Sequence, residues 1–158
     1  PSQTYALVIG INTYQSPDYA DLTAAVNDAN DMEKYLLSSL QVPSQNLINL
    51  RNEQATRTGI LEGCKKLQDI SEGAEDPCFI IFYAGHGARS AKPVEWSDWE
   101  SDSDQVEVLC PCDIGVVRDG EVVEGIPDRT VCYLLNRLSK QRSNNIVRTT
   151  LFTAELKD

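Results

Sequence analysis

The stretch CFIIFYAGHG at residues 78–87 decides the fold. Its first part, Cys78 to Tyr83, is a continuous apolar run of β-branched and aromatic side chains, which is typical of a strand buried on both faces of a sheet. The run leads directly into Gly85-His86-Gly87. Open α/β sheets have their ligand crevices at the carboxyl ends of central parallel strands, so we expect His86 to lie in a functional site.

The residues before this stretch alternate between strand and helix patterns. We expect strands at 5–9 and 47–50, and a second helix capped by Thr58. The first helix is predicted from apolar residues spaced along one helix face, namely Leu22, Ala25, Val26, Ala29, Met32, Leu36 and Leu40. This βαβ rhythm predicts a parallel sheet covered by helices on both faces.

Shorter elements follow the histidine. In chain order we expect a polar, acid-rich loop at 88–105, a strand at 106–109, a hairpin at 116–123 turning at Asp119-Gly120, a helix starting at Pro127-Asp128, and a last strand from Asn145. The chain has no internal repeat and no linker-like stretch. We therefore expect residues 1–158 to form a single domain.

The length, apolar content and net charge of the chain indicate one compact core and disfavour some classes of binding partner. A chain of 158 residues with 41% apolar residues can bury about 70% of its unfolded surface around one core. Twenty-four acidic residues against fourteen basic ones give a net charge of −10, which disfavours nucleic acid and anionic membranes as partners. No apolar stretch approaches the roughly 20 residues of a membrane helix.

The cysteines favour a reducing compartment. Their number is five, they lack CxxC pairing, and His86 is the single histidine that could join them at a zinc site. We therefore expect a soluble, cytoplasmic protein with reduced thiols. The chain begins with Pro1 and not with Met, which indicates that a segment upstream was trimmed or lies outside this sequence.

Two roles are open for His86 at this point. An imidazole titrates near neutral pH and is suited to moving protons, and the flanking glycines leave room for a substrate or another backbone to approach it. The alternative is that the ring only satisfies a carbonyl group of a loop.

Three motifs in register resemble the caspase and metacaspase family, and its metacaspase branch in particular. They are residues 5–12, residues 27–29 (Asn-Asp-Ala) and residues 79–87, and the similarity extends over about residues 4–147. Cys110-Pro111-Cys112-Asp113 corresponds to a Pro-x-Asp of that family. The resemblance implies a caspase-like three-layer α/β/α sandwich with a mainly parallel sheet, present here as the large-subunit half only.

The resemblance also implies roles for three residues. Family members hydrolyse peptide bonds with a Cys/His dyad, so His86 would be the dyad histidine and the Gly87 N–H would stabilise the oxyanion. Asp28 matches the acidic pocket residue of metacaspases, which cut after Arg or Lys; the alternative is that Asp28 only decorates a solvent-facing helix surface. Residues 10–33 contain five acidic residues and no Lys or Arg, which favours a peptide or protein substrate with a basic side chain.

The sequence departs from the family where the nucleophile is expected. In the family, the last strand of this half continues into Asp-x-Cys-His-x-Gly, whereas residues 148–158 contain no cysteine and form an off-pattern tail. Only Cys110 and Cys112 follow the histidine closely enough to be substitutes, and we expect neither to serve. We therefore expect this polypeptide to be inactive, with the small-subunit half or an active homologue as a partner.

The sequence predicts no metal site and no cofactor in this chain. Acidic residues alternate at 98, 100, 102 and 104, but Ser103 and Leu109 stand where a calcium-binding EF-hand loop needs Gly and Glu. Calcium is a cofactor that the resemblance allows in a complete homologue, through other acids; of one acidic pair that serves there, only Asp128 is present here.

Two other functions remain open. One is a non-catalytic caspase-like module that regulates active relatives or acts as a scaffold. The other is a doubly wound phosphate or nucleotide binder, but the residues after Gly10 show neither GxGxxG nor GxxxxGK[ST].

Overall fold

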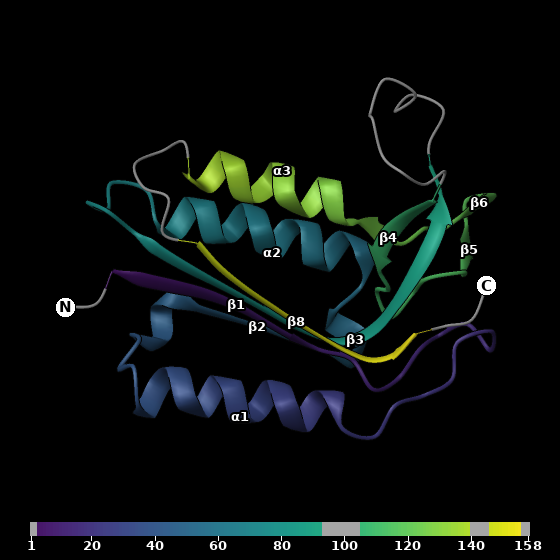
Figure 1. Cartoon of the computed structure of the whole chain (residues 1–158), viewed down its shortest axis with the longest axis horizontal. Coiled ribbons are helices and arrows are strands. Elements are labelled where there is room, and N and C mark those ends of the chain that lie inside the picture. The colour runs from purple at the N-terminus through teal and green to yellow at the C-terminus, as the bar shows by residue number, and fades with distance from the viewer. Residues whose placement is uncertain (1–2, 93–104, 140–145, 156–158) are drawn as a thin grey trace.

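The computed structural model of the chain describes residues 3–92, 105–139 and 146–155. A curled, mixed β-sheet lies between helix α1 (Ala25–Ser38) on one face and helices α2 (Arg57–Ile70) and α3 (Asp128–Ser139) on the other (Figure 1). This arrangement confirms the predicted three-layer α/β/α sandwich.

Four parallel strands form the part of the sheet between the helices. Their bounds are β1 (Thr4–Gly10), β2 (Leu47–Arg51), β3 (Cys78–Ala91) and β8 (Ile146–Glu155). β1 pairs with β2 on one side and with β3 on the other, and β8 pairs with the far side of β3. Central β3 is therefore flanked on both sides, as its continuous apolar run requires.

β3 is longer than predicted. The sequence pattern ends the strand at Tyr83 and starts a polar loop at Ala88, but β3 continues to Ala91 because residues 87–91 pair antiparallel with β4 (Gln105–Leu109). That pairing uses backbone groups and tolerates the polar side chains that suggested a loop. Residues 93–104 of the predicted acidic loop lie outside the described residues.

Residues 105–127 contain the strands that extend the sheet past β3 and a separate two-stranded hairpin. β4 also pairs with the short strand β7 (Ile126–Pro127), which the sequence did not predict. Strands β5 (Val117–Arg118) and β6 (Glu121–Val122) form the predicted hairpin. Its turn residues Asp119 and Gly120 have φ values of 52° and 85°, the left-handed conformation that a tight two-residue turn needs.

The helix starts differ from the sequence prediction in physically clear ways. Thr56, and not Thr58, caps α2, because its extended backbone lets its hydroxyl accept the Gly59 N–H at 3.0 Å. α1 begins only at Ala25, and the Asn12 side chain accepts the Val26 N–H at 3.0 Å from across the loop. Single-turn 3₁₀ helices precede and follow β2 at Ser44–Asn46 and Asn52–Gln54.

Strand alternation divides the core into two layers. Leu7, Ile9 and Ile81 point to the side of α2, where they pack with Ile60 and Leu67. The intervening side chains point to the side of α1 and form a smaller core: Ala6, Val8, Phe82 and Ala84 pack with Ala25, Ala29, Leu36 and Val42.

Candidate functional site around His86

His86 lies inside β3, where the parallel sheet gives way to its antiparallel extension. The pairing of β1 with β3 ends at Gly10 and Ala84, just before His86. The histidine is therefore at the carboxyl end of the parallel part, as predicted, but it belongs to a strand and not to a loop. Its exposed fraction is 2%, so its environment is set by the protein.

The loop between β1 and α1, residues 11–24, covers the imidazole. The Nε2 atom of His86 lies 2.7 Å from the carbonyl oxygen of Ala20, and the ring of Tyr14 lies 4.7 Å from the imidazole between centroids. A carbonyl only accepts hydrogen bonds, so Nε2 carries a proton in this contact. The loop-carbonyl contact that the sequence left open is therefore present, and it also orients the ring.

Two tyrosine hydroxyls hold the backbone of His86. The His86 N–H donates to the Tyr14 hydroxyl at 2.8 Å, and the Tyr83 hydroxyl lies 2.8 Å from the carbonyl oxygens of both His86 and Cys110. Burial raises the pKa of Tyr14 to about 12, against smaller opposing effects of its hydrogen bonds with His86 and Tyr83. Both hydroxyls therefore stay protonated at neutral pH.

Gly85 has a different role from the one expected for it. A Cβ atom on Gly85 would lie 2.6 Å from the Tyr83 hydroxyl oxygen and 3.0 Å from that of Tyr14. The missing side chain thus admits two tyrosine hydroxyls of the protein itself, and this contact accounts for the glycine without a substrate.

Gly87 is paired on both sides. It is in register with Leu109 of β4 and with Glu155 of β8. The Cys110 N–H donates to the His86 carbonyl at 3.1 Å, which makes Gly87 and Leu109 a non-hydrogen-bonded pair. The Gly87 N–H therefore points away from β4, toward the side of the sheet on which β8 lies.

Asp28 lies in the first turn of α1, on the same side of the sheet as His86. α1 packs against β1 and β3. Alternation along β3 puts His86 on the side of Phe82 and Ala84, which is the α1 side. Asp28 is half-buried, so it is not a fully solvated surface residue.

Three other acids, in α1 and in the loop before it, are already engaged. Glu33 forms an ion pair with Arg51 at 3.0 Å, Asp21 accepts the Tyr14 N–H at 2.9 Å, and the Ser16 hydroxyl donates to Asp18 at 3.4 Å. Asp28 and Asp31 make no such side-chain contact within the described part of the chain. Of these two, Asp31 is exposed.

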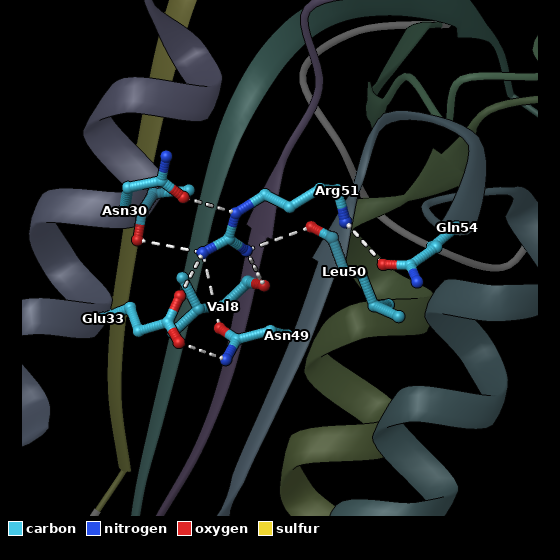
Figure 2. A network of polar contacts seen from close by, with 8 residues as sticks. Val8, Asn30, Glu33, Asn49, Leu50, Arg51 and Gln54 are labelled. Carbon is cyan, nitrogen blue, oxygen red and sulfur yellow. Dashed lines mark hydrogen bonds and ion pairs between the residues drawn. The ribbon is translucent and has the colours of Figure 1, made fainter.

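Arg51 is a cation that the sequence argument overlooked, because it lies far from α1 along the chain. Figure 2 shows its guanidinium between α1 and the ends of β1 and β2. Its hydrogen-bond acceptors are the carbonyl oxygens of Val8, Ala29 and Leu50 and the side chains of Asn30, Glu33 and Asn49. Glu33 and Asp28 are five residues apart, about 140° around the helix. Arg51 therefore neutralises the β2 flank of α1, and Asp28 lies on the opposite flank.

The described thiols near the histidine are buried and protonated. Cys110 and Cys112 have exposed fractions of 0%. Burial raises the pKa of Cys110 to about 12 and that of Cys112 to about 11. Since the thiolate is the nucleophilic form, neither side chain is suited to attack a carbonyl. Cys64 is buried on the inner face of α2, as predicted. The side chain of Cys132 is not among those that the structure describes.

Asp113, the counterpart of the Pro-x-Asp aspartate, holds α2 in place. Its carboxylate is buried, accepts the Arg57 N–H at 2.8 Å and lies 3.5 Å from the Arg118 guanidinium. A carboxylate at a helix N-terminus stabilises the helix through its free N–H groups. A groove of about 660 Å³ opens beside it, between α2 and the β5–β6 hairpin, and His86 is not among its described lining residues.

No grouping of three or more His, Cys, Asp or Glu side chains suited to a metal ion occurs within residues 3–92, 105–139 and 146–155. The acidic residues at 98–104 lie outside these ranges. Asp128, at the start of α3, has one buried carboxylate oxygen that finds no hydrogen-bond partner among the described residues. Among the helices so described, none combines the length and the apolar character needed to cross a bilayer.

Comparison with known proteins points to one family. Residues 3–138 match the family described as caspase domain. The chain is 29% identical over 115 residues to metacaspase-1 of Candida albicans, covering 68% of this chain and 25% of that protein. It is also 29% identical over 126 residues to metacaspase-8 of Arabidopsis thaliana, covering 75% of this chain and 31% of that protein.

Solved structures agree at the level of the fold. The crystal structure of protein GSU0716 from Geobacter sulfurreducens superimposes with a TM-score of 0.61 at 18% identity, covering 95% of this chain and 49% of that one. The chain spans a quarter to a third of the two metacaspases. The match over residues 3–138 and the sandwich fold that agrees with it show that the chain belongs to the caspase domain family.

Proposed function

We propose that this chain is the large-subunit half of a metacaspase-like cysteine peptidase domain directed to peptide bonds after Arg or Lys. In a complete domain that supplies the nucleophilic cysteine, His86 would transfer protons, the Gly87 N–H would stabilise the oxyanion, and Asp28 would receive the basic side chain of the substrate. This polypeptide has no cysteine in residues 148–158, and we expect it to be inactive by itself. The observation that carries this proposal is the burial of the single imidazole, oriented by the Ala20 carbonyl at 2.7 Å, at the carboxyl end of the parallel strands.

The chemistry assigned to His86 follows from its fixed ring. In a Cys/His dyad, a thiolate attacks the scissile carbonyl, a tetrahedral oxyanion forms, and a proton must reach the leaving amine as the C–N bond breaks. Because the Nε2 proton is engaged with Ala20, Nδ1 is the atom that takes up and delivers the proton. A ring held in one orientation needs no reorganisation at this step.

The preference for a basic side chain rests on the charges around α1. Asp28 is half-buried on the flank of the helix away from Arg51, while the carboxylate of Glu33 is paired with that arginine. An unpaired, half-buried carboxylate favours a cationic partner, and a guanidinium can bind it through two hydrogen bonds.

The role proposed for Gly87 requires that its N–H be accessible to the reacting carbonyl of the substrate. An oxyanion donor must face the reacting carbonyl, whereas Glu155 of β8 lies alongside Gly87 in this structure. The proposal therefore requires the end of β8 to lie away from Gly87 when substrate binds.

A non-catalytic, partner-binding module is the second candidate. The high pKa values of Cys110 and Cys112 favour it, because neither thiol is a nucleophile at neutral pH. β8 is paired only with β3 among the described strands, so its other edge offers free backbone groups. The small-subunit half or an active homologue would bind there by adding a strand.

Turnover and peptide binding test the two parts of this proposal separately. The 158-residue polypeptide should show no hydrolysis of Arg-, Lys- or Asp-containing peptide amides, with or without calcium. Reproducible hydrolysis that Cys112→Ala abolishes and Cys64→Ala preserves would contradict the statement about the thiols.

Peptide binding is measured by fluorescence anisotropy with three labelled peptides that differ at one residue: Arg, its neutral isostere citrulline, or Asp. The Arg peptide should bind best, and Asp28→Asn should weaken it about tenfold, the effect of about 1.4 kcal/mol of lost interaction. Asp31→Asn, on the same helix, is the matched control and should leave binding unchanged. Equal binding of the three peptides would contradict the assigned preference.

A further inference from the structure

His86 is held by an arrangement that differs from ordinary strand pairing. Buried backbone groups are almost always hydrogen-bonded, and within a sheet the neighbouring strand supplies the partners. At His86 the N–H finds a tyrosine hydroxyl instead, and the carbonyl accepts from a second tyrosine in addition to the Cys110 N–H. The pairing of β3 with β8 shifts register at the same place, between Gly85 and His86.

We propose that Tyr14 and Tyr83 are positioning residues for His86, with their hydroxyls fixing its backbone beside Gly85, which has no side chain and therefore admits them. This inference rests on the proposed function in one respect, namely that His86 is the residue that transfers protons. Neither tyrosine is assigned contact with substrate.

The Tyr14 and Tyr83 hydroxyls act at neighbouring positions on the backbone of His86. Tyr83 has one hydroxyl proton for two carbonyl oxygens, those of His86 and Cys110, each at 2.8 Å. The Tyr14 hydroxyl lies close by, because a Cβ atom on Gly85 would lie 2.6 Å from the Tyr83 hydroxyl oxygen and 3.0 Å from that of Tyr14. The two hydroxyls therefore share the space that the missing side chain leaves, and they hold the backbone of His86 at its N–H and at its carbonyl.

Tyr14 links the backbone of His86 to its side chain. Its hydroxyl binds the backbone N–H, while its ring packs against the imidazole at 4.7 Å with an interplanar angle of 46°. Its own N–H donates to Asp21, the neighbour of the Ala20 carbonyl that binds Nε2. One loop thus presents both the hydroxyl and the carbonyl, so a shift of Tyr14 is transmitted to the ring of His86.

The experiment uses His86 as its own reporter, because it is the only histidine of the chain. The ¹⁵N chemical shifts of the imidazole give the fraction of the neutral ring that is protonated at Nε2. Hydrogen exchange of the His86 amide gives the frequency of local opening. Both are measured on the full chain for Tyr14→Phe and Tyr83→Phe, and neither readout needs enzymatic activity.

We expect Tyr14→Phe to lower the Nε2-protonated fraction and to raise amide exchange at His86 at least about tenfold, the scale of one lost buried hydrogen bond. Tyr83→Phe should have a smaller effect, because the Cys110 N–H still donates to the His86 carbonyl. Tyr35→Phe removes the same hydroxyl from a residue that is 52% exposed and should change neither signal.

A core variant separates positioning from simple loss of stability. Ile60→Val trims a buried side chain of the same hydrophobic layer. It should speed amide exchange through global unfolding while leaving the imidazole shifts in place. If Tyr14→Phe changes stability as Ile60→Val does, with an unchanged Nε2-protonated fraction, the inference is wrong. A failure of peptide binding, with these NMR results as expected, would instead contradict only the proposed function.

Discussion

The Nε2 atom of His86 and the carbonyl oxygen of Ala20 lie 2.7 Å apart, and they join β3 to the loop that precedes α1. This contact ties the orientation of the single imidazole to the conformation of residues 11–24. It predicts that the neutral ring carries its proton at Nε2. The ¹⁵N shifts of the neutral imidazole in the wild-type chain test this directly, and a ring protonated at Nδ1 would contradict it.

Thiol labelling provides a second prediction. Cys110 and Cys112 should react with iodoacetamide far more slowly than Cys78, which is only partly buried, because burial raises the pKa of the two inner thiols to about 12 and about 11. Mass spectrometry of peptides from the native and the urea-unfolded chain gives the rates. Rapid native labelling of Cys112 would show an accessible thiolate and reopen its candidacy as a nucleophile.

Replacing Arg51 should destabilise the fold. Arg51→Met leaves buried carbonyl groups without a donor and Glu33 without its counterion, at an expected cost of about 2–3 kcal/mol. Arg51→Lys should cost less, since an ammonium group keeps the charge but loses the forked geometry. Urea unfolding measures both against Lys34→Met, an exposed cation on α1. Equal stability of the Met variants would show that the network in Figure 2 contributes nothing.

The buried Cys110 thiol and Tyr14 hydroxyl predict that the folded chain loses stability at alkaline pH. Burial raises the pKa of Cys110 from 9.0 to about 12 and that of Tyr14 from 10.0 to about 12. Both pKa values are higher in the folded chain, so their contribution to stability is complete below pH 9 and is lost as the pH rises toward 12. The unfolding free energy should fall across this window. Cys110→Ala should flatten the fall; an unchanged slope would contradict this assignment.

The parallel sheet was predictable because its signals are local. The apolar run 78–83 and the helix stripe ending at Leu40 each follow from side-chain periodicity, and the turn at Asp119-Gly120 follows from local backbone preference. The continuation of β3 to Ala91 was not predictable in this way, because it depends on backbone pairing with β4, the next described strand along the chain, and not on side-chain periodicity.

The candidate site also contains residues that the sequence could predict and residues that it could not. His86 could be found from its place after a buried strand. Tyr14, the Ala20 carbonyl and Arg51 could not, because they reach the site or α1 only through the fold. In the sequence, the missing side chain of Gly85 indicates room for the approach of a substrate or another backbone. In the structure this space admits hydroxyl groups of the protein itself.

Titration of the ¹⁵N-labelled chain with an Arg-containing peptide tests most directly whether His86 and Asp28 belong to one peptide-binding site. We predict that the imidazole signals of His86 and the backbone amide of Asp28 shift together, with one dissociation constant, and that Asp28→Asn weakens both responses. Shifts confined to one of the two residues, or equal shifts with the Asp-containing peptide, would contradict it.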